Sequence, residues 1–110
     1  MNDSQSNAEH SVVTTAPPQD DEIHIVLPER FVFETHRRFR AGYYKHGHSG
    51  RSYVVDFRLT RFIDSAGLGM LLQLSEHIER DSSRLRFINV TSDISATLLV
   101  AGFDQLATIQ

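Results

Sequence analysis

Short apolar runs alternate with amphipathic segments along this chain of 110 residues. Residues 23–27 place isoleucine and leucine at every second position, and residues 52–57 and 85–90 are rich in β-branched and aromatic side chains, so all three predict strands. Residues 66–80 and 94–101 carry apolar side chains at helical spacing. Strands that alternate with helices form parallel pairs joined by right-handed crossovers, so the pattern predicts a small α/β domain.

Local signals predict the remaining elements. Residues 31–33 indicate a second short strand, which we expect to form a hairpin with the first at the edge of the sheet. Thr35 is expected to cap a helix that runs to about His46. Gly102 fits the left-handed position just past the last helix, and residues 106–109 indicate a final edge strand.

Composition limits the size and the class of the protein. A chain of this length fits one domain, which we place at residues 22–110 after a polar segment, 1–21, that we expect to be a flexible tail. Cysteine is absent, the net charge is -3, and neither a signal peptide nor a transmembrane segment is evident. We therefore expect a cytoplasmic protein that neither binds nucleic acid nor inserts into a membrane.

The stretch FIDSAGLG, residues 62–69, places a serine between an aspartate and two glycines where a strand gives way to a helix. A catalytic nucleophile is one hypothesis, but Ile63 occupies the position where a nucleophile elbow needs glycine, and His77 is the only later histidine. We therefore expect no enzyme. A phosphate-binding turn is a second hypothesis, although Gly67 and Gly69 lack the third glycine and the lysine of the known loops.

A modified serine is the third hypothesis. If Asp64 or Ser65 caps the helix, the Ser65 hydroxyl lies in solvent beside unpaired backbone N–H groups. A phosphoryl group there gains about 0.3 to 1 kcal/mol from the helix dipole, which repulsion from Asp64 partly offsets. A partner docked over the same place would have to bury an unpaired dianion, at a cost of several kcal/mol. Phosphorylation would then control binding without unfolding the domain. We expected Gly67 and Gly69 to help by letting a partner backbone approach closely.

These residues resemble a known family. The run 64–69, preceded by the strand 54–57 and by 62–63, is similar to the motif of STAS domains, the fold shared by bacterial anti-sigma factor antagonists and the tails of sulphate transporters. The resemblance extends from about Glu22 to Ile109. It implies a STAS fold with a small mixed β-sheet and helices mainly on one face. It also implies no cofactor, and an output of binding instead of catalysis.

The resemblance implies a partner-switching mechanism. The unphosphorylated protein would bind an anti-sigma factor or serine-protein kinase, phosphorylation of Ser65 would release that partner, and a PP2C-type phosphatase would reset the protein. The position matched by Ser65 is the family's phosphoacceptor, and the turn and the helix around it form the partner surface. The partner-binding residues that we expect are Asp64, Ser65, Ala66, Gly67, Leu68, Gly69 and Arg61.

Other hypotheses remain open at this point. Ser65 could be an unmodified cap in a constitutive STAS subunit of a lipid ABC transporter or of a stressosome-like assembly. Where many members carry a carboxylate near the phosphorylation site, this chain has Val32, for which Glu34 could substitute. Three histidines, His36, His46 and His48, suggest a metal site, but without cysteine or a clear carboxylate partner we expect none. Basic side chains on the first predicted helix either steer an acidic partner or, as we favour, only contact solvent.

Overall fold

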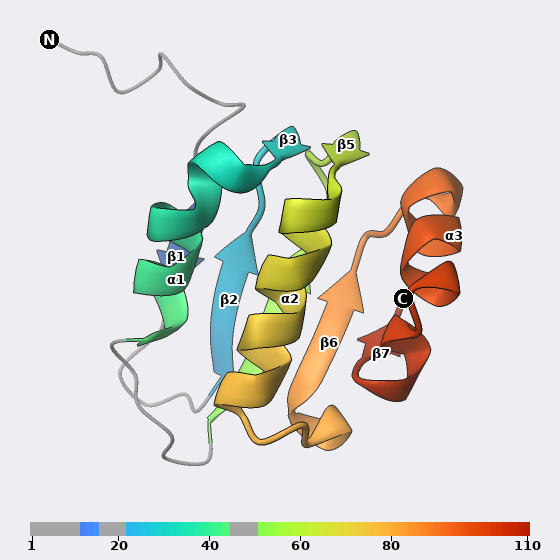
Figure 1. Ribbon diagram of the computed structural model, residues 1–110. Coiled ribbons are helices and arrows are strands. Elements are labelled where there is room, and N and C mark those ends of the chain that lie inside the picture. The colour runs from blue at the N-terminus through green and yellow to red at the C-terminus, as the bar shows by residue number, and fades with distance from the viewer. Residues whose placement is uncertain (1–11, 16–21, 45–50) are drawn as a thin grey trace, which may run out of the picture.

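The computed structural model describes residues 12–15, 22–44 and 51–110. Within these residues the main sheet has five strands in the order β1-β2-β4-β6-β7 (Figure 1). Strand β1 is antiparallel to β2, and the other neighbouring pairs are parallel. The bounds of these strands are Val13–Thr15 for β1, Glu22–Val26 for β2, Ser52–Asp56 for β4, Leu85–Ile88 for β6 and Thr108–Ile109 for β7.

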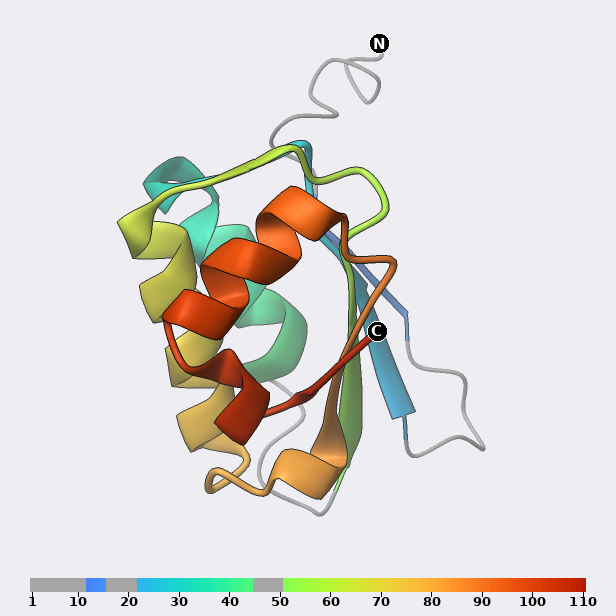
Figure 2. The same ribbon diagram turned by 90° about the vertical axis from the view of Figure 1, so that its right-hand side faces the viewer.

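Three α-helices cover one face of this sheet, as Figure 2 shows. Helix α1 (His36–Tyr44) connects β2 to β4, α2 (Ser65–His77) precedes β6, and α3 (Ser92–Val100) precedes β7. Successive parallel strands lie side by side and each helix returns to the same face, which is the arrangement that parallel crossovers produce. The predicted α/β architecture, with a mixed sheet and helices on one face, is confirmed.

The core lies between the sheet and the helices. Alternation along the strands turns one set of side chains toward the helices, and these are fully buried, as with Ile25, Val55 and Phe87. The helices contribute the apolar stripes expected from their spacing. Their largest contributions to this core are Phe39, Tyr43, Leu71, Leu74 and Leu98. Among the described helices, none combines the length and the apolar character that crossing a bilayer requires.

Strand β1 lies in the segment that we expected to be a flexible tail. Val13–Thr15 pairs with β2 and forms one edge of the sheet, so the expectation does not hold for these three residues. A glycine on α1 makes room for them, since a methyl group on Gly42 would collide with the hydroxyl of Thr14. Apart from Val12, the rest of residues 1–21 lies outside the described residues.

The predicted hairpin is wrong. Strand β3 is Arg30–Phe31 and pairs in parallel with β5 (Phe62–Ile63), so the two form a separate two-stranded sheet. The carbonyl of Glu29 accepts the backbone N–H groups of both Arg61 and Phe62. Strand β3 therefore pairs with a segment distant in the sequence and does not form the predicted hairpin with β2. The antiparallel edge partner of β2 is β1 instead.

The start of α1 also differs from the prediction. Thr35 does not cap the helix but lies in a preceding 3₁₀ turn, Phe33–Thr35, where it is fully buried and its hydroxyl donates to the carbonyl of Val32 at 2.7 Å. Helix α1 is described to Tyr44, and His46 lies outside the described residues. Residues 103–105 form another 3₁₀ turn.

The carboxy-terminal predictions hold. Thr91 caps α3 by accepting the backbone N–H of Ile94 at 3.3 Å, and Gly102 adopts a left-handed conformation with φ of 84° past the end of the helix. Strand β7 then adds to the edge of the sheet beside β6.

Helix α2 ends at His77, before the predicted end, because Glu79 and Arg80 both have positive φ.

A buried carboxylate fixes the loop that leads from β4 toward β5. Asp56 is 2% exposed, and its Oδ1 accepts the backbone N–H of Arg58 at 2.9 Å and the side-chain amide of Asn89 at 3.0 Å. His24 Nε2 lies 3.4 Å from Oδ2. Burial raises the pKa of Asp56, but the hydrogen bonds from Asn89, Arg58 and His24 together with the Arg58 charge outweigh it, so the pKa lies below its ordinary value.

A close backbone contact fixes α2 on β3. A methyl group on Gly67 would overlap the carbonyl oxygen of Phe31 and would lie 2.8 Å from Cγ1 of Ile63. Gly69, one half-turn further along α2, would place a methyl group in open space. The two glycines of the motif therefore differ in role, because only Gly67 is required for packing.

We expect Asp56→Asn to lower the free energy of unfolding at pH 7 by about 1 to 3 kcal/mol, because hydrogen bonds to a buried charge are lost. Since the pKa of Asp56 is lowered by folding, its contribution is present above the unfolded pKa of about 4 and is lost as pH falls through the folded value. Urea unfolding of the wild type and the variant should therefore converge toward pH 3. Asp81→Asn, at an exposed carboxylate that accepts Ser83 N–H, is the control and should cost much less. A pH-independent difference for Asp56 would contradict this prediction.

Gly67→Ala and Gly69→Ala form a second matched pair. Gly67→Ala should destabilise the protein by about 1 to 3 kcal/mol because α2 must move away from β3. Gly69→Ala should stabilise it by up to about 1 kcal/mol, since alanine is the better helix former and nothing obstructs its methyl group. Thermal and urea unfolding measure both effects. Equal effects at the two positions would show that the contact with Phe31 does not matter.

Candidate functional site

The FIDSAGLG stretch forms the end of β5 and the first turn of α2. Asp64 is the N-cap of α2, with extended backbone angles, and its Oδ1 accepts the backbone N–H of Gly67 at 2.7 Å. Its carbonyl accepts the N–H of Leu68 at 3.1 Å. Of the two residues that could have capped this helix, Asp64 therefore does so. Ser65 is the first helical residue, and its side chain is not needed for the cap.

Ser65 is exposed at the amino end of α2. Its hydroxyl makes no hydrogen bond to another described residue, so it is open to modification. The neighbouring backbone N–H groups carry the partial positive charge of a helix amino terminus, which favours an added anion. Asp64, one residue earlier, opposes that effect. The Ser65 side chain thus lies at the surface and outside the buried core.

The other expected site residues divide by exposure. Gly69 is exposed, and Ala66 and Leu68 are half-buried, so they border the Ser65 side chain on the surface of α2. Gly67 is buried against β3 and lets this strand approach, which corrects the expectation that it serves the approach of a partner. Arg61 is exposed, and its Nε lies 3.8 Å from a carboxylate oxygen of Glu29. The structure therefore brings Asp64, Ser65, Ala66, Leu68 and Gly69 to one surface.

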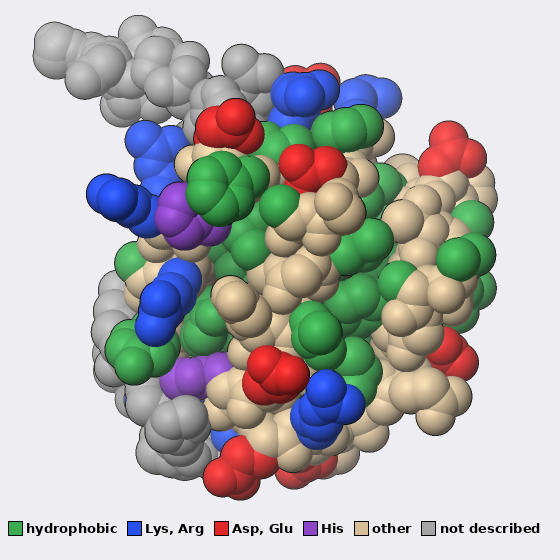
Figure 3. Space-filling model, viewed as in Figure 1, with side chains coloured by type: hydrophobic (Ala, Val, Ile, Leu, Met, Phe, Trp, Pro, Cys, Tyr) green, Lys and Arg blue, Asp and Glu red, His purple; other side chains and the backbone are tan. Residues whose placement is uncertain are grey.

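Sequence reasoning missed three exposed or stacked residues near this turn. Phe62, in β5, is 44% exposed, and the Arg30 guanidinium lies 4.7 Å from its ring centroid. Phe33, which we expected within a strand, is 59% exposed and stacks on His36. Figure 3 shows apolar side chains on this face over and beside α2. The parallel pairing of β3 with β5 places Arg30 over Phe62, and no local pattern indicates that pairing.

The structure does not support a catalytic role for Ser65 with His77. The two residues lie at opposite ends of α2, about 18 Å apart at 1.5 Å per residue. His77 is 8% exposed and packs against the rings of Tyr43 and Tyr53. It cannot act as the base for the Ser65 hydroxyl. The phosphate-loop hypothesis is also unsupported, because the Gly67 N–H is already bonded to Asp64.

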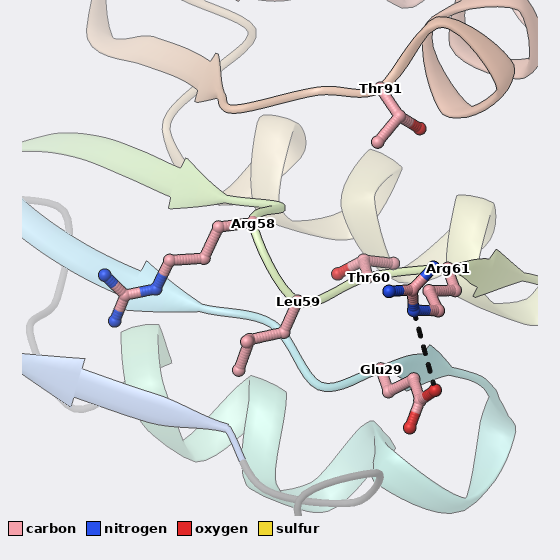
Figure 4. A pocket seen from close by; sticks show the side chains of 6 residues that line it. All are labelled: Glu29, Arg58, Leu59, Thr60, Arg61 and Thr91. Carbon is pink, nitrogen blue, oxygen red and sulfur yellow. Dashed lines mark ion pairs between the residues drawn. The ribbon is translucent and has the colours of Figure 1, made fainter.

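A hollow of about 340 Å³ lies beside the β4–β5 loop. Its lining is formed by Glu29, Arg58, Leu59, Thr60, Arg61 and Thr91 (Figure 4). Figure 4 shows Arg58 pointing away from Arg61, which instead approaches Glu29. Thr60 is buried and donates to the carbonyl of Pro28 at 3.0 Å. The two arginines do not converge on one point, so the hollow is not built to hold a phosphate group.

Two further sequence hypotheses can be placed. Val32 is 5% exposed and Glu34 is exposed in the 3₁₀ turn, so the residue that replaces the family's carboxylate is part of the packed structure. The Nδ1–H of His36 donates a hydrogen bond to the carbonyl of Phe33 at 2.8 Å. His46 and His48 lie outside the described residues, and no cluster of histidine, aspartate and glutamate suited to a metal occurs within the described part of the chain.

Comparison with known proteins identifies the family. A family model described as "Mlab, STAS domain" matches residues 15–108. The STAS-domain containing protein PA14_20770 of Pseudomonas aeruginosa (strain UCBPP-PA14) is 34% identical over 98 residues, which cover 88% of this chain and 97% of that protein.

Solved structures of low identity share the fold. The anti-sigma factor antagonist SpoIIAA matches in its unphosphorylated form with a TM-score of 0.70 and 16% identity, covering 91% of this chain and 87% of that one. The phosphorylated form of SpoIIAA, a Bacillus cell fate determinant, matches with a TM-score of 0.69, 16% identity and 91% coverage of both chains. Murine Slc26a9, an anion transporter, matches with a TM-score of 0.63 and 13% identity, covering 91% of this chain and only 20% of that one. Together with the family match, these findings show that the chain belongs to the STAS-domain family.

Proposed function

We propose that this protein is an anti-sigma factor antagonist that switches partners through phosphorylation of Ser65. The unphosphorylated form binds an anti-sigma factor or serine-protein kinase over the first turn of α2. The phosphorylated form releases it, and a PP2C-type phosphatase restores binding. The scheme uses ATP and a transcription partner, and therefore places the protein in the cytoplasm.

The observation that carries this proposal is that Asp64 and Ser65 have different roles at the start of α2. Asp64 caps α2, and Ser65 presents a free hydroxyl one residue later. A phosphoryl group on Ser65 extends into solvent in the free protein, so the cost to folding is small. In a complex the same group would be buried against the partner, where an unpaired dianion costs several kcal/mol. The difference in free energy between the solvated and the buried phosphoryl group therefore favours release of the partner.

The SpoIIAA structures support the proposal by analogy of fold. That protein was solved in unphosphorylated and phosphorylated forms, and this chain matches both with nearly the same TM-score, 0.70 and 0.69. The fold of SpoIIAA therefore survives its modification. For this chain, the exposed position of Ser65 at the helix terminus gives a physical reason to expect the same tolerance.

A second candidate is a constitutive STAS subunit of a lipid ABC transporter or of a stressosome-like assembly. The observation in its favour is that the same fold forms about a fifth of the Slc26a9 transporter chain. In that role Ser65 is an unmodified surface residue, and charge at this position has no regulatory effect. The two candidates therefore differ in what an added charge does to binding.

Binding of the anti-sigma factor or kinase should depend on charge at Ser65. We expect Ser65→Asp to weaken binding about 100-fold or more, because several kcal/mol separate buried from solvated charge and about 1.4 kcal/mol corresponds to tenfold. Ser65→Ala should bind like the wild type. Ser92→Asp is the matched control, since Ser92 is also exposed as the first residue of a helix after its cap. Titration calorimetry measures all three. Unchanged affinity of Ser65→Asp would favour the constitutive subunit.

The kinase should transfer one phosphoryl group from ATP to Ser65, and Ser65→Ala should accept none. Phosphorylated protein should keep the unfolding free energy of the unmodified form within about 1 kcal/mol, because the dipole term and the repulsion from Asp64 are small and opposed. Intact-mass spectrometry and urea unfolding give the two measurements. A large loss of stability on phosphorylation would show that release follows from unfolding of the domain.

A further inference from the structure

The outer face of α1 is a cationic surface that the proposed switch does not use. A shallow hollow of about 370 Å³ is lined by His36, Arg37, Arg40, Ala41 and Tyr44, which we call the α1 strip. Arg37, Arg40 and Tyr44 are exposed, and Figure 3 shows blue side chains gathered over this helix. No acidic residue occurs within α1. The strip is therefore a local positive patch on a chain whose net charge is -3.

The arginines of the α1 strip have no carboxylate partners among the described residues. Four arginines elsewhere in the described chain lie within 4 Å of a carboxylate, whereas Arg30 contacts the Phe62 ring and Arg84 donates to backbone carbonyls; the four are Arg58, Arg61, Arg80 and Arg86. Glu34, in the turn before α1, makes no ion pair with Arg37 or Arg40 within the described structure. Glu76 lines a second hollow beside Arg40 but is paired with Arg80 at 3.3 Å. Two guanidinium groups of the strip thus remain available for an external anion.

The strip is also partly preorganised. The Arg40 guanidinium lies 4.6 Å from the ring centroid of Tyr44, which restrains the planar group one turn above that ring. Arg37 is three residues before Arg40, so the two side chains are neighbours on the same side of the helix. Ala41, whose side chain is small, also lines the hollow. A planar guanidinium held in place favours carboxylate or phosphate groups bound in a bidentate manner.

We propose that the α1 strip docks an acidic segment of the protein partner, with two of that segment's carboxylates on Arg37 and Arg40. The inference rests on the proposed function, because it assigns the partner's chemistry on the helix that packs beside α2. Arg40 and Tyr44 of the strip lie beside Glu76 and His77, toward the end of α2 away from Ser65. Helix α1 packs beside α2 on the same face of the sheet, as Figures 1 and 2 show. A partner that covers the start of α2 and extends along the α1 and α2 face reaches the strip as well. The strip adds attraction that phosphorylation of Ser65 does not remove.

Other polyanions fit the α1 strip less well. The helix has nine residues and so is about 14 Å long, and nucleic-acid binding commonly uses a longer track with several phosphate contacts. A helix that lies on a membrane inserts its apolar face into lipid, whereas the apolar face of α1, with Phe39 and Tyr43, is buried in the core. A short acidic polypeptide segment matches the size of the hollow and the number of available cations.

The first test uses a defined probe and does not need the partner. Isotope-labelled protein is titrated with a helical peptide of about 20 residues that carries glutamate at every fourth position, and with its glutamine analogue. We expect saturable NMR shifts in residues 33–44 with the glutamate peptide only. The double variant Arg37→Glu/Arg40→Glu should bind about tenfold more weakly or not at all. Arg38→Glu, which lies on the same helix and lines a different hollow beside β1, is the control and should bind like the wild type.

Three results would overturn the inference. One is the absence of saturable shifts in α1, and another is an equal loss of binding in the Arg38→Glu control. The third is tighter binding to vesicles that contain phosphatidylserine, or to duplex DNA, than to the glutamate peptide. Any one of these would show that the strip has no preference for an acidic polypeptide.

The second test uses the anti-sigma factor or kinase that the unphosphorylated protein retains. Arg37→Glu/Arg40→Glu should slow association about tenfold and reduce the dependence of its rate on salt, while Ser65 still accepts a phosphoryl group. Unchanged association would refute the inference and leave the switch intact. If Ser65→Asp instead binds like the wild type, the proposed phosphorylation switch is refuted. The peptide titration then still tests whether the α1 strip binds an acidic segment.

Discussion

The carboxylate of Asp64 accepts the backbone N–H of Gly67 at 2.7 Å, and this contact determines where α2 begins. Because Asp64 fulfils the cap, the next residue enters the helix with its hydroxyl free. Gly67, held by the same hydrogen bond, faces inward and lets α2 approach the carbonyl of Phe31 on β3. One local interaction therefore sets both the packing of α2 and the exposure of Ser65.

In the proposed switch, stability and regulation reside in separate parts of this small domain. The core between the sheet and the helices is apolar, and the loop after β4 is fixed by the buried carboxylate of Asp56. Ser65 lies at the edge of that framework, where added charge contacts solvent and not the core. A domain arranged in this way keeps its structure while its surface charge changes. A binding switch requires this separation, since a modification that unfolded the protein would expose it to degradation and aggregation.

The face that carries α1 and α2 has two kinds of side chain. Near the start of α2, Phe62 and Phe33 expose aromatic rings, and Leu68 adds a half-buried apolar group. On α1, Arg37 and Arg40 provide charge that is not paired with a carboxylate of the described residues. Apolar contacts at the centre supply most of the affinity of an interface, and charges at its rim guide association and orientation. In our proposals, phosphorylation of Ser65 weakens contacts at the centre of the interface, and the α1 strip increases the rate at which the partner associates.

Local sequence chemistry was sufficient for much of the fold. Alternating apolar residues marked β2, β-branched and aromatic residues marked β4, and helical spacing marked α2. Gly102 marked the end of α3 because only a residue without Cβ readily takes its left-handed angles. The same local rules indicated that Asp64 or Ser65 would cap α2. Each of these features depends on residues within a few positions of one another.

Tertiary structure decided what local patterns leave open. Residues 13–15 are too short to identify themselves as a strand, and they are ordered by pairing with β2 and by a glycine on α1. The strand expected at 31–33 pairs with β5, far along the chain, and not with the strand before it. Thr35 has the side chain of a good cap but is buried in the turn before α1. The sequence alone determined the alternation of β2, β4 and β6 with the three α-helices and the placement of Ser65 at a helix start. Only the folded chain decided that Asp64 provides the cap and that Gly67 is buried, because those outcomes depend on the packing of α2 against β3.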